Sequence, residues 1–257
     1  MIDTKFNELG WTSIPSLYNR EYIDFAKQTI NSLYPKYNEI QKKGGVFSES
    51  ENCLHHIAVF CPELVEKTFN DKLINFLLDY FQGKFILNAF GSTGLLPKGK
   101  TYTQKPHRDA RDIHSSKDML NLVILLDDST SQNGATKLIE GSHLTNKIDD
   151  YDNFNTKSIS INGNAGDLII FNPYLLHSTG VNVSDKSRTI ITAMVTRPFI
   201  KSQMDYVRAI KKHFSNLYFE SCSDLMKQLF GYYSRVPESF NEFYVTKDLR
   251  SYRSDQF

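Results

Sequence analysis

The stretch from Ala165 to Gly180 has the sequence AGDLIIFNPYLLHSTG. Its apolar run, Leu168 to Phe171, follows a Gly-Asp pair and is typical of a short buried strand. Pro173 then marks a turn, and His177 follows where a new strand is expected to begin. A titratable ring among apolar residues is costly to bury without a partner. We therefore expect His177 to hold one, and a metal ion is a suitable candidate.

Short strand patterns extend on both sides of this stretch. We expect strands over residues 84–90, 100–106, 120–126, 135–139, 157–161, 167–171 and 188–197, with clusters of Gly, Asn, Asp and Ser between them. The run LNLVILL at 120–126 has the length of a strand that is buried on both faces. This series of strands predicts a sandwich or a barrel.

Helical patterns flank the strands. Apolar residues recur at helical spacing from Asn19 to Leu33, before Pro35, and again from Leu64 to Tyr80. The pattern after Pro198 is helical again. We therefore expect one α+β, mainly β, domain over residues 1–257. It has a helical N-terminal layer at about 1–83, a β core at about 84–198 and C-terminal helical elements at about 199–257.

Composition restricts the class of partner. The chain has 257 residues, of which 40% are hydrophobic, and a formal net charge of +1, so neither nucleic acid nor an anionic membrane is an expected partner. No apolar run approaches the length of a membrane span, and the N-terminus lacks the apolar core of a signal peptide. Three cysteines without paired spacing suit a reducing compartment, and we expect a cytoplasmic protein. The oligomeric state is not predicted.

A possible second half of a metal site lies in KPHRDARDIH, residues 105–114. His107 and Asp109 are two residues apart, and on an extended backbone such side chains share a face, with Cα atoms about 6.6 Å apart. This pair alone is common in solvated loops. Together with His177, however, it supplies the two histidines and one carboxylate that form the facial triad of non-haem Fe(II) oxygenases.

Arg188 is the candidate for holding an organic cosubstrate. If the chain turns near residue 183, Arg188 returns nearly opposite His177 on a partner strand, and shares one face with Ile190, Thr192 and Met194. A guanidinium among apolar residues is well explained by a bound carboxylate, which it can hold bidentately. The positive charges of Fe(II) and Arg188 would balance Asp109 and the two carboxylates of 2-oxoglutarate, leaving no stranded charge.

These residues together resemble a known family. His107-x-Asp109, Gly141-Ser142-His143, GDLIIF at 166–171, His177 and an arginine eleven residues later resemble the phytanoyl-CoA dioxygenase family of Fe(II)/2-oxoglutarate oxygenases. The resemblance covers about residues 84–198. It implies a double-stranded β-helix, a cupin-like jelly roll, braced by N- and C-terminal helices.

The resemblance also implies roles for individual residues. His107, Asp109 and His177 match the metal ligands, and Arg188 matches the anchor of the C5 carboxylate of 2-oxoglutarate. Thr179 matches a hydroxyl that assists this anchor. Asn121 is a further candidate for contact with the cosubstrate.

The expected function is therefore that of an Fe(II)- and 2-oxoglutarate-dependent dioxygenase. We expect it to use dioxygen to hydroxylate an unactivated C–H bond of a small biosynthetic molecule, with release of succinate and CO2. The presence of Asp109 argues against halogenation, because related halogenases have a small residue there. Two alternatives are a catalytically silent cupin-like ligand-binding module and a metal-dependent isomerase or epimerase of the cupin class, which would not need Arg188.

The substrate is not defined by the sequence. Lys105, Arg108 and Arg111 lie next to the predicted metal ligands and could attract an anionic substrate, although solvated charges explain them equally well. Arg197, near the end of the last core strand, is a further candidate for substrate binding. His55 and His56 precede an apolar run and are expected to be surface or capping groups.

Overall fold

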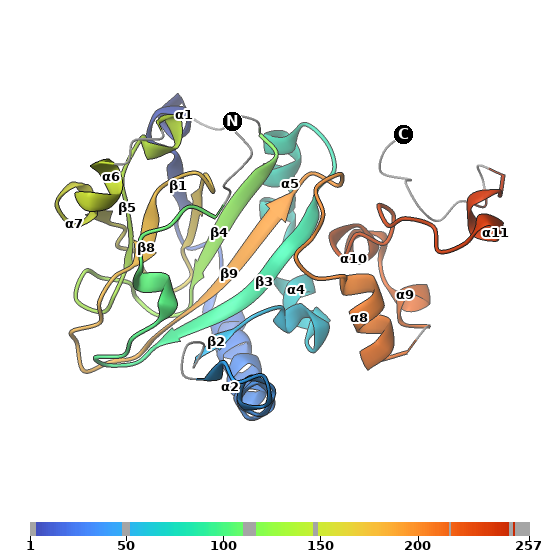
Figure 1. The fold of residues 1–257 in the computed structure, drawn as a ribbon, viewed down its shortest axis with the longest axis horizontal. Helices are drawn as coiled ribbons and strands as arrows, with labels where there is room; N and C mark the ends of the chain where they lie inside the picture. Colours follow the sequence, from blue (N-terminus) through green and yellow to red (C-terminus); the bar gives the residue numbers. More distant parts are fainter. Residues whose placement is uncertain are drawn as a thin grey trace.

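The computed structural model describes residues 4–47, 52–109, 117–145, 149–215, 217–246 and 249. Its strands form two antiparallel sheets (Figure 1). The larger sheet has the strand order β1-β7-β4-β9-β3-β2 and the smaller sheet the order β6-β5-β8. The strands are β1 Trp11–Ile14, β2 Cys53–Leu54, β3 Ile86–Leu95, β4 Met119–Leu125, β5 Thr136–Leu138, β6 Ile159–Ser160, β7 Leu168–Phe171, β8 His177–Thr179 and β9 Arg188–Thr196.

Strand β4 lies inside the larger sheet, between β7 and β9, and is buried on both faces, as its apolar run predicted. Leu122 and Ile124 belong to an apolar cluster that also contains helical residues. Val123 and Leu125 belong to a second cluster, which includes Leu138 of the smaller sheet. Because successive side chains of a strand point to opposite faces, β4 contributes to both the helix-facing core and the core between the sheets.

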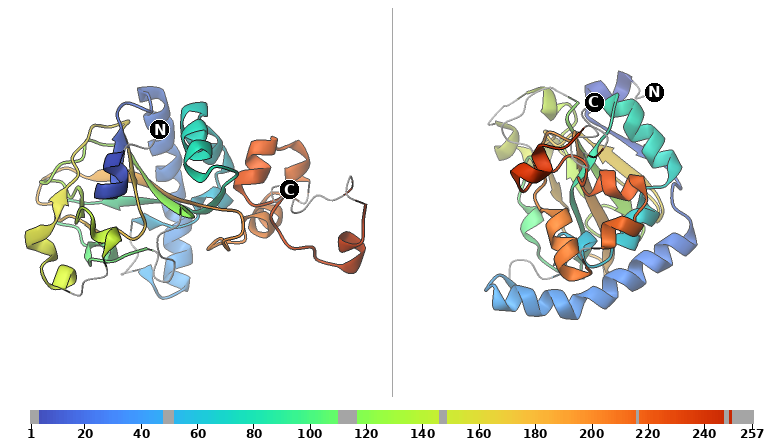
Figure 2. Two further views of the ribbon diagram at one scale, coloured as in Figure 1. Left: turned by 90° about the horizontal axis from the view of Figure 1, so that it is seen from above. Right: turned by 90° about the vertical axis from the view of Figure 1, so that its right-hand side faces the viewer.

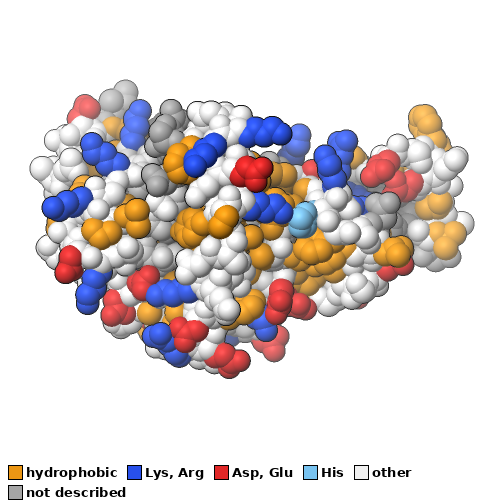
Figure 3. All heavy atoms as spheres, turned by 90° about the horizontal axis from the view of Figure 1, so that it is seen from below, with side chains coloured by type: hydrophobic (Ala, Val, Ile, Leu, Met, Phe, Trp, Pro, Cys, Tyr) orange, Lys and Arg blue, Asp and Glu red, His pale blue; other side chains and the backbone are white. Residues whose placement is uncertain are grey.

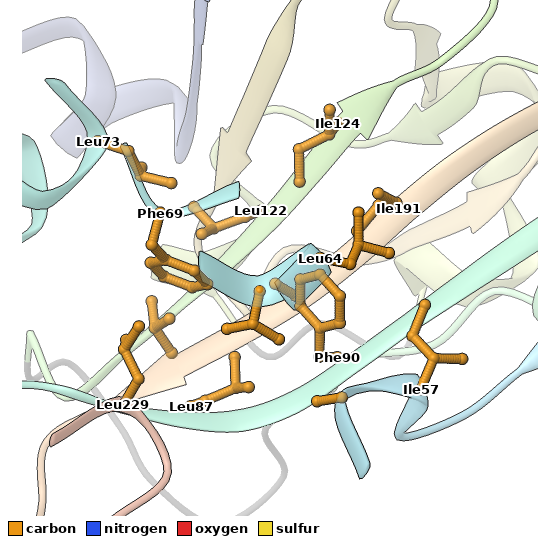
Figure 4. Packing of buried hydrophobic residues seen from close by; sticks show 14 of the residues in the cluster. Ile57, Leu64, Phe69, Leu73, Leu87, Phe90, Leu122, Ile124, Ile191 and Leu229 are labelled. Carbon is orange, nitrogen blue, oxygen red and sulfur yellow. The ribbon is translucent and has the colours of Figure 1, made fainter. Parts of the chain in front are cut away.

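Three helices cover the face of the larger sheet that is turned away from the smaller sheet (Figure 2). They are α2 Arg20–Lys43, α4 Pro62–Thr68 and α5 Asp71–Phe81. Figure 4 shows Leu64, Phe69 and Leu73 of this layer packed toward Leu122 and Ile191 of the sheet. A short helix, α1 Thr4–Leu9, precedes β1, and the 3-10 turn η1, Ile57–Val59, precedes α4.

The helix bounds differ from the predicted ones. Helix α2 begins at the cap Asn19, whose side chain accepts a hydrogen bond from the backbone of Tyr22, but it continues past Pro35 to Lys43. Pro35 and Asn31 are both exposed, so water can satisfy the Asn31 carbonyl that the proline leaves without a donor. The second predicted helix is divided at Asn70, whose side chain caps α5.

The N-terminal layer is not purely helical, which corrects the expectation. Strand β1 pairs with β7, and β2 pairs with β3. Runs of four and two residues are too short for a period of two to be recognised in the sequence. The predicted extended segment at 100–106 instead contains the 3-10 turn η2, Tyr102–Gln104.

Strand β3 is longer than predicted and carries a bulge. It runs through two glycines expected in a loop, and a Cβ at Gly91 would meet the Leu54 carbonyl at 2.6 Å, so this close strand pairing requires glycine. The register shifts between Leu87 and Ala89. As a result, Leu87 and Phe90, three residues apart, both pack in the helix-facing core.

The remaining helices lie at the edges of the two sheets. Helices α8 to α11 follow β9 beside the end of the larger sheet, and α11 lies farthest from the sheets (Figure 1). The segment before α8 is tied to the β3 bulge, because Gln203 donates its backbone N–H to the Asn88 carbonyl at 3.2 Å. The bounds are η3 Ser142–Leu144, α6 Asp149–Asp152, α7 Phe154–Lys157, α8 Tyr206–His213, α9 Tyr218–Ser221, α10 Asp224–Leu229 and α11 Phe240–Phe243.

On the face shown in Figure 3, acidic and basic side chains are interspersed, and neither sign forms a continuous patch. This mixture agrees with the net charge of +1. Within the described ranges, no helix combines the length and apolar character needed to cross a bilayer.

Candidate metal centre

Backbone hydrogen bonds bring the predicted ligands together. The N–H of His107 donates to the carbonyl of His177 at 2.9 Å, and the N–H of His177 donates back to His107 at 3.0 Å. The N–H of Asp109 donates to the Pro173 carbonyl, also at 3.0 Å. The segment 107–109 is therefore paired antiparallel with residues 173–177, which end at the first residue of β8, and two parts of the chain that are distant in sequence carry one site.

Each imidazole is fixed in one tautomer. Nδ1 of His107 lies 2.8 Å from the Lys105 carbonyl oxygen, and Nδ1 of His177 lies 2.9 Å from that of Leu175. A carbonyl oxygen only accepts hydrogen bonds, so each Nδ1 carries the proton. In the neutral rings, Nε2 therefore presents a lone pair, which is the form that binds a metal.

The three side chains converge through their acceptor atoms. Nε2 of His107 lies 3.5 Å from Oδ1 of Asp109, and Nε2 of His177 lies 3.4 Å from Oδ2. One ligand atom from each of the three residues lies within 4.8 Å of the others. Two imidazole lone pairs facing a carboxylate need a cation between them. The donor set fits a divalent metal and matches the facial triad of non-haem Fe(II) sites.

Asn121 on β4 orients the carboxylate. Its side-chain Nδ2 donates to Oδ2 of Asp109 at 2.6 Å. Burial raises the pKa of the Asp109 carboxyl, but the His177 and His107 rings, when they carry a second proton in place of a metal ion, and the Asn121 amide together lower that pKa below its ordinary value. The ionised form is the one that binds a metal. The sequence suggested cosubstrate contact for Asn121, whereas its observed partner is Asp109.

The three ligands line a cavity of about 410 Å³. Ile190, Thr192 and Met194 of β9 contribute to its wall, as their predicted common face requires. Other walls come from β3, β4 and β8, and from residues before β3. Beside the metal position there is thus space for a small organic molecule.

The expected hairpin between His177 and Arg188 is wrong. Strand β8 belongs to the smaller sheet, where His177 pairs with Leu138 of β5. Arg188 begins β9 in the larger sheet and pairs with Leu95 of β3. The connecting loop passes from one sheet to the other, and Asn182 holds it by donating to the Leu95 carbonyl at 3.2 Å.

Arg188 is nevertheless a buried cation with an unused donor. It is 1% exposed, and it donates from Nε and Nη2 to the carbonyls of Asn133 at 3.3 Å and Gly134 at 2.6 Å. Its Nη1 is buried without a hydrogen-bond partner among the described residues. Burial lowers the pKa of Arg188 to about 10. Arg188 does not itself line the cavity, but Ile190, next on that side of the strand, does.

The other predicted residues have different positions. The Thr179 hydroxyl lies 2.8 Å from that of Thr103, and both residues line the cavity. Lys105 is exposed and contributes its carbonyl to His107. Arg197 pairs with Asp118 at 3.2 Å and is absent from the cavity wall. Arg111 lies outside the described residues.

Arg108 lines the cavity, and its contact with a substrate stays a prediction. Its guanidinium donates to the backbone carbonyls of Ser142 at 2.7 Å, Thr145 at 3.1 Å and Tyr174. Arg108 is buried. Its side chain reaches these three carbonyls from a backbone position between His107 and Asp109.

Among the cavity residues that the sequence did not select are His55, Tyr102 and Gln203. His55 is exposed, as expected, and its Nε2 lies 3.3 Å from the Tyr102 hydroxyl at the cavity. Its position depends on β2, a strand of two residues. Gln203 depends on the link between its segment and the β3 bulge, and neither feature has a signal in local sequence patterns.

Two facing antiparallel sheets with the ligands at one end define a double-stranded β-helix, and solved structures confirm this fold. The chain is similar to EctD from S. alaskensis, solved with 2-oxoglutarate and 5-hydroxyectoine, with a TM-score of 0.63 and 14% identity over 75% of this chain and 74% of that one. It is also similar to SnoK, a non-heme alpha ketoglutarate dependent carbocyclase from nogalamycin biosynthesis. That match has a TM-score of 0.60 and 16% identity over 76% of this chain and 82% of that one.

The family model of phytanoyl-CoA dioxygenase (PhyH) matches residues 11–190. The chain therefore belongs to the phytanoyl-CoA dioxygenase family, as the sequence resemblance predicted. An uncharacterized protein of Mycobacterium tuberculosis, Rv1501, is 34% identical over 137 residues, which are 53% of this chain and 49% of that protein. The chain thus spans about half the length of this curated relative.

Proposed function

We propose that this protein is an Fe(II)- and 2-oxoglutarate-dependent oxygenase that hydroxylates a small biosynthetic molecule. The observation that carries the proposal is the convergence of two imidazole lone pairs and one carboxylate beside a cavity. The membership of the phytanoyl-CoA dioxygenase family supports the same reaction class. Iron and 2-oxoglutarate, when bound, supply the oxidation of a C–H bond by dioxygen, with release of succinate and CO2.

In this proposal, His107, Asp109 and His177 hold the iron. Arg188 holds the far carboxylate of 2-oxoglutarate through its unused Nη1, which removes the cost of a buried donor without an acceptor. Thr179 lines the cavity and offers a hydroxyl toward the same ligand.

The rest of the cavity positions the substrate. His55, Tyr102 and Gln203 offer hydrogen-bonding groups, while Leu54 and Met194 offer apolar contacts. Because the oxidant reacts with the nearest C–H bond, these contacts select the atom that is oxidised. Enclosure by such side chains also excludes water from the reaction.

The experiment is a screen of small molecules with anaerobically loaded Fe(II), 2-oxoglutarate and then air. We expect one class of compound to stimulate succinate formation and to gain one oxygen atom by mass spectrometry. The His177→Ala variant should abolish both signals. A ring closure, as in SnoK, would release succinate with loss of two hydrogens from the substrate.

Two results would contradict the proposal. Ligand binding without succinate formation across the screen would favour a silent binding module. A change of substrate configuration that needs a metal but proceeds without 2-oxoglutarate would favour an isomerase, and Arg188→Met would then leave the activity unchanged.

A further inference from the structure

In the sequence, Arg108 lies between the candidate ligands His107 and Asp109. Its own side chain donates hydrogen bonds to backbone carbonyls of other segments. The residue is 9% exposed. Its Nη1 donates to the carbonyls of Ser142, at 2.7 Å, and of Tyr174, while Nη2 donates to the carbonyl of Thr145 at 3.1 Å. A buried cation is costly unless it is hydrogen-bonded, and here three carbonyl dipoles serve that purpose.

The three carbonyls belong to two segments, one of which leads directly to His177. Ser142 and Thr145 lie in and just after the turn η3, and Tyr174 lies in the loop that leads to His177. These two segments are also joined to each other, because the Ser142 hydroxyl oxygen accepts from the N–H of Leu176 at 2.9 Å. The Arg108 guanidinium thus connects the segment of His107 and Asp109 with both.

We propose that Arg108 is a positioning residue for the metal centre, an inference that rests on the proposed function. Its guanidinium holds the backbone that carries His107 and Asp109 against the backbone that carries His177. Among the described residues, three backbone hydrogen bonds join these segments directly at the ligands. Metal ligands must be held to within about 0.5 Å of their productive geometry, and a side chain that locks two ligand segments together supplies this precision.

Arginine suits this role better than lysine. A guanidinium has five N–H donors in a rigid planar fork, so one side chain can serve carbonyls in different directions. A lysine ammonium is a compact point charge on a flexible stem, and it can reach only part of this set. The Lys variant should therefore restore part of the function that an uncharged variant loses.

The test uses Co(II) as the probe with the full chain, without 2-oxoglutarate or dioxygen. Calorimetric titration gives the affinity, and the visible ligand-field absorption of Co(II) reports the arrangement of its ligands. We expect Arg108→Met to weaken Co(II) binding about ten-fold or more and to alter the absorption, and Arg108→Lys to recover part of both. Circular dichroism and thermal unfolding of the metal-free variants show the folded fraction.

Arg197→Met is the matched control. It removes another partly buried arginine, the partner of Asp118, which holds no ligand segment. We expect this control to lose stability while it binds Co(II) like the wild type. The inference is wrong if Arg108→Met keeps the wild-type affinity and absorption, or if Arg197→Met weakens binding equally. If Arg108→Met does not fold, an unchanged Co(II) affinity of Arg108→Lys overturns it.

The proposed function fails separately from this inference. If the wild type does not bind Co(II), or if His177→Ala binds it equally well, the metal centre itself is wrong. If the wild type binds and His177→Ala does not, only the comparison of the Arg108 variants decides the role of Arg108.

Discussion

At the scale of single residues, Arg188 is costly for stability. Its guanidinium is fully buried, one of its donors has no partner among the described residues, and burial lowers its pKa. Its two other donors satisfy the carbonyls of Asn133 and Gly134, which offsets only part of the cost of burying the charge. A residue of this kind is best explained by a ligand that completes its hydrogen bonds.

We predict that Arg188→Met separates binding from stability. The affinity for 2-oxoglutarate in the presence of Co(II) should fall about 100-fold, which corresponds to about 2.7 kcal/mol. The free energy of unfolding without ligand should fall by only about 1–3 kcal/mol, because removal of the buried charge partly offsets the loss of donors to the carbonyls of Asn133 and Gly134. Calorimetry and urea unfolding measure the two quantities. A large loss of stability with unchanged affinity would contradict the anchoring role.

His56 gives a prediction for pH. Its Nδ1 lies 3.0 Å from the hydroxyl of the buried Tyr206, and burial, together with the charge of His55, lowers its pKa to about 4. The unfolded chain binds this proton near pH 6.5, so between these values the unfolded state holds more protons than the native state. Stability should therefore fall as the pH decreases from about 6.5 to about 4.

The variant His56→Asn should remove this part of the pH dependence. Asparagine does not titrate here and tolerates the left-handed backbone of residue 56, whose φ is +56°. We expect the loss of stability between the two pH values to shrink by on the order of 2 kcal/mol, measured by urea unfolding without metal. If the wild type and the variant lose the same stability between these two pH values, His56 is not the cause of the pH dependence.

The convergence of His107, Asp109 and His177 was predictable in part from local patterns, and in part from the family resemblance. His107 and Asp109 share a face by strand alternation, and His177 is a polar residue in an apolar stretch. The partners of Arg108 and His55 depend on carbonyls and hydroxyls from distant segments, which no local pattern encodes. For this reason the sequence did not show that Arg108 binds three carbonyls, or that His55, although exposed, also lines the cavity.

At the scale of elements, the long and strongly patterned segments were predicted best. The buried strand at 120–126 and the helix that starts after Asn19 are both observed. Strand β1 was missed because its stability comes from pairing with β7 rather than from its own four residues. The predicted hairpin between His177 and Arg188 was wrong for a similar reason, because the local sequence does not show that β8 and β9 belong to different sheets.

The pairing of β2 with β3 gives a prediction at this scale. A Cβ at Gly91 would lie 2.6 Å from the Leu54 carbonyl, so Gly91→Ala should push β2 away and displace His55 from the cavity. We expect a loss of about 2 kcal/mol in stability by chemical unfolding, with weaker substrate stimulation but unchanged Co(II) affinity. Gly83→Ala is the control, because its nearest neighbour, Nη1 of Arg197, is 4.0 Å away. Equal stability of the two variants would contradict the prediction.

At the scale of the whole molecule, we predict that the metal stabilises the fold by itself and that the cosubstrate adds stability only after the metal has bound. Co(II) at about 100 times its Kd should add about 2.7 kcal/mol, since the native state alone has the three ligands assembled. 2-Oxoglutarate should add stability only when Co(II) is present, because it needs both the metal and Arg188. Thermal unfolding with each addition measures this, and a full effect of 2-oxoglutarate without metal would contradict it.

The attachment of Gln203 to the β3 bulge has a consequence for how such enzymes diversify. The family match ends at residue 190, whereas Gln203 enters the cavity from the segment beyond it. The shape of the cavity therefore depends in part on a residue outside the family match, so a change at position 203 alters which molecule fits there without touching the three candidate ligands.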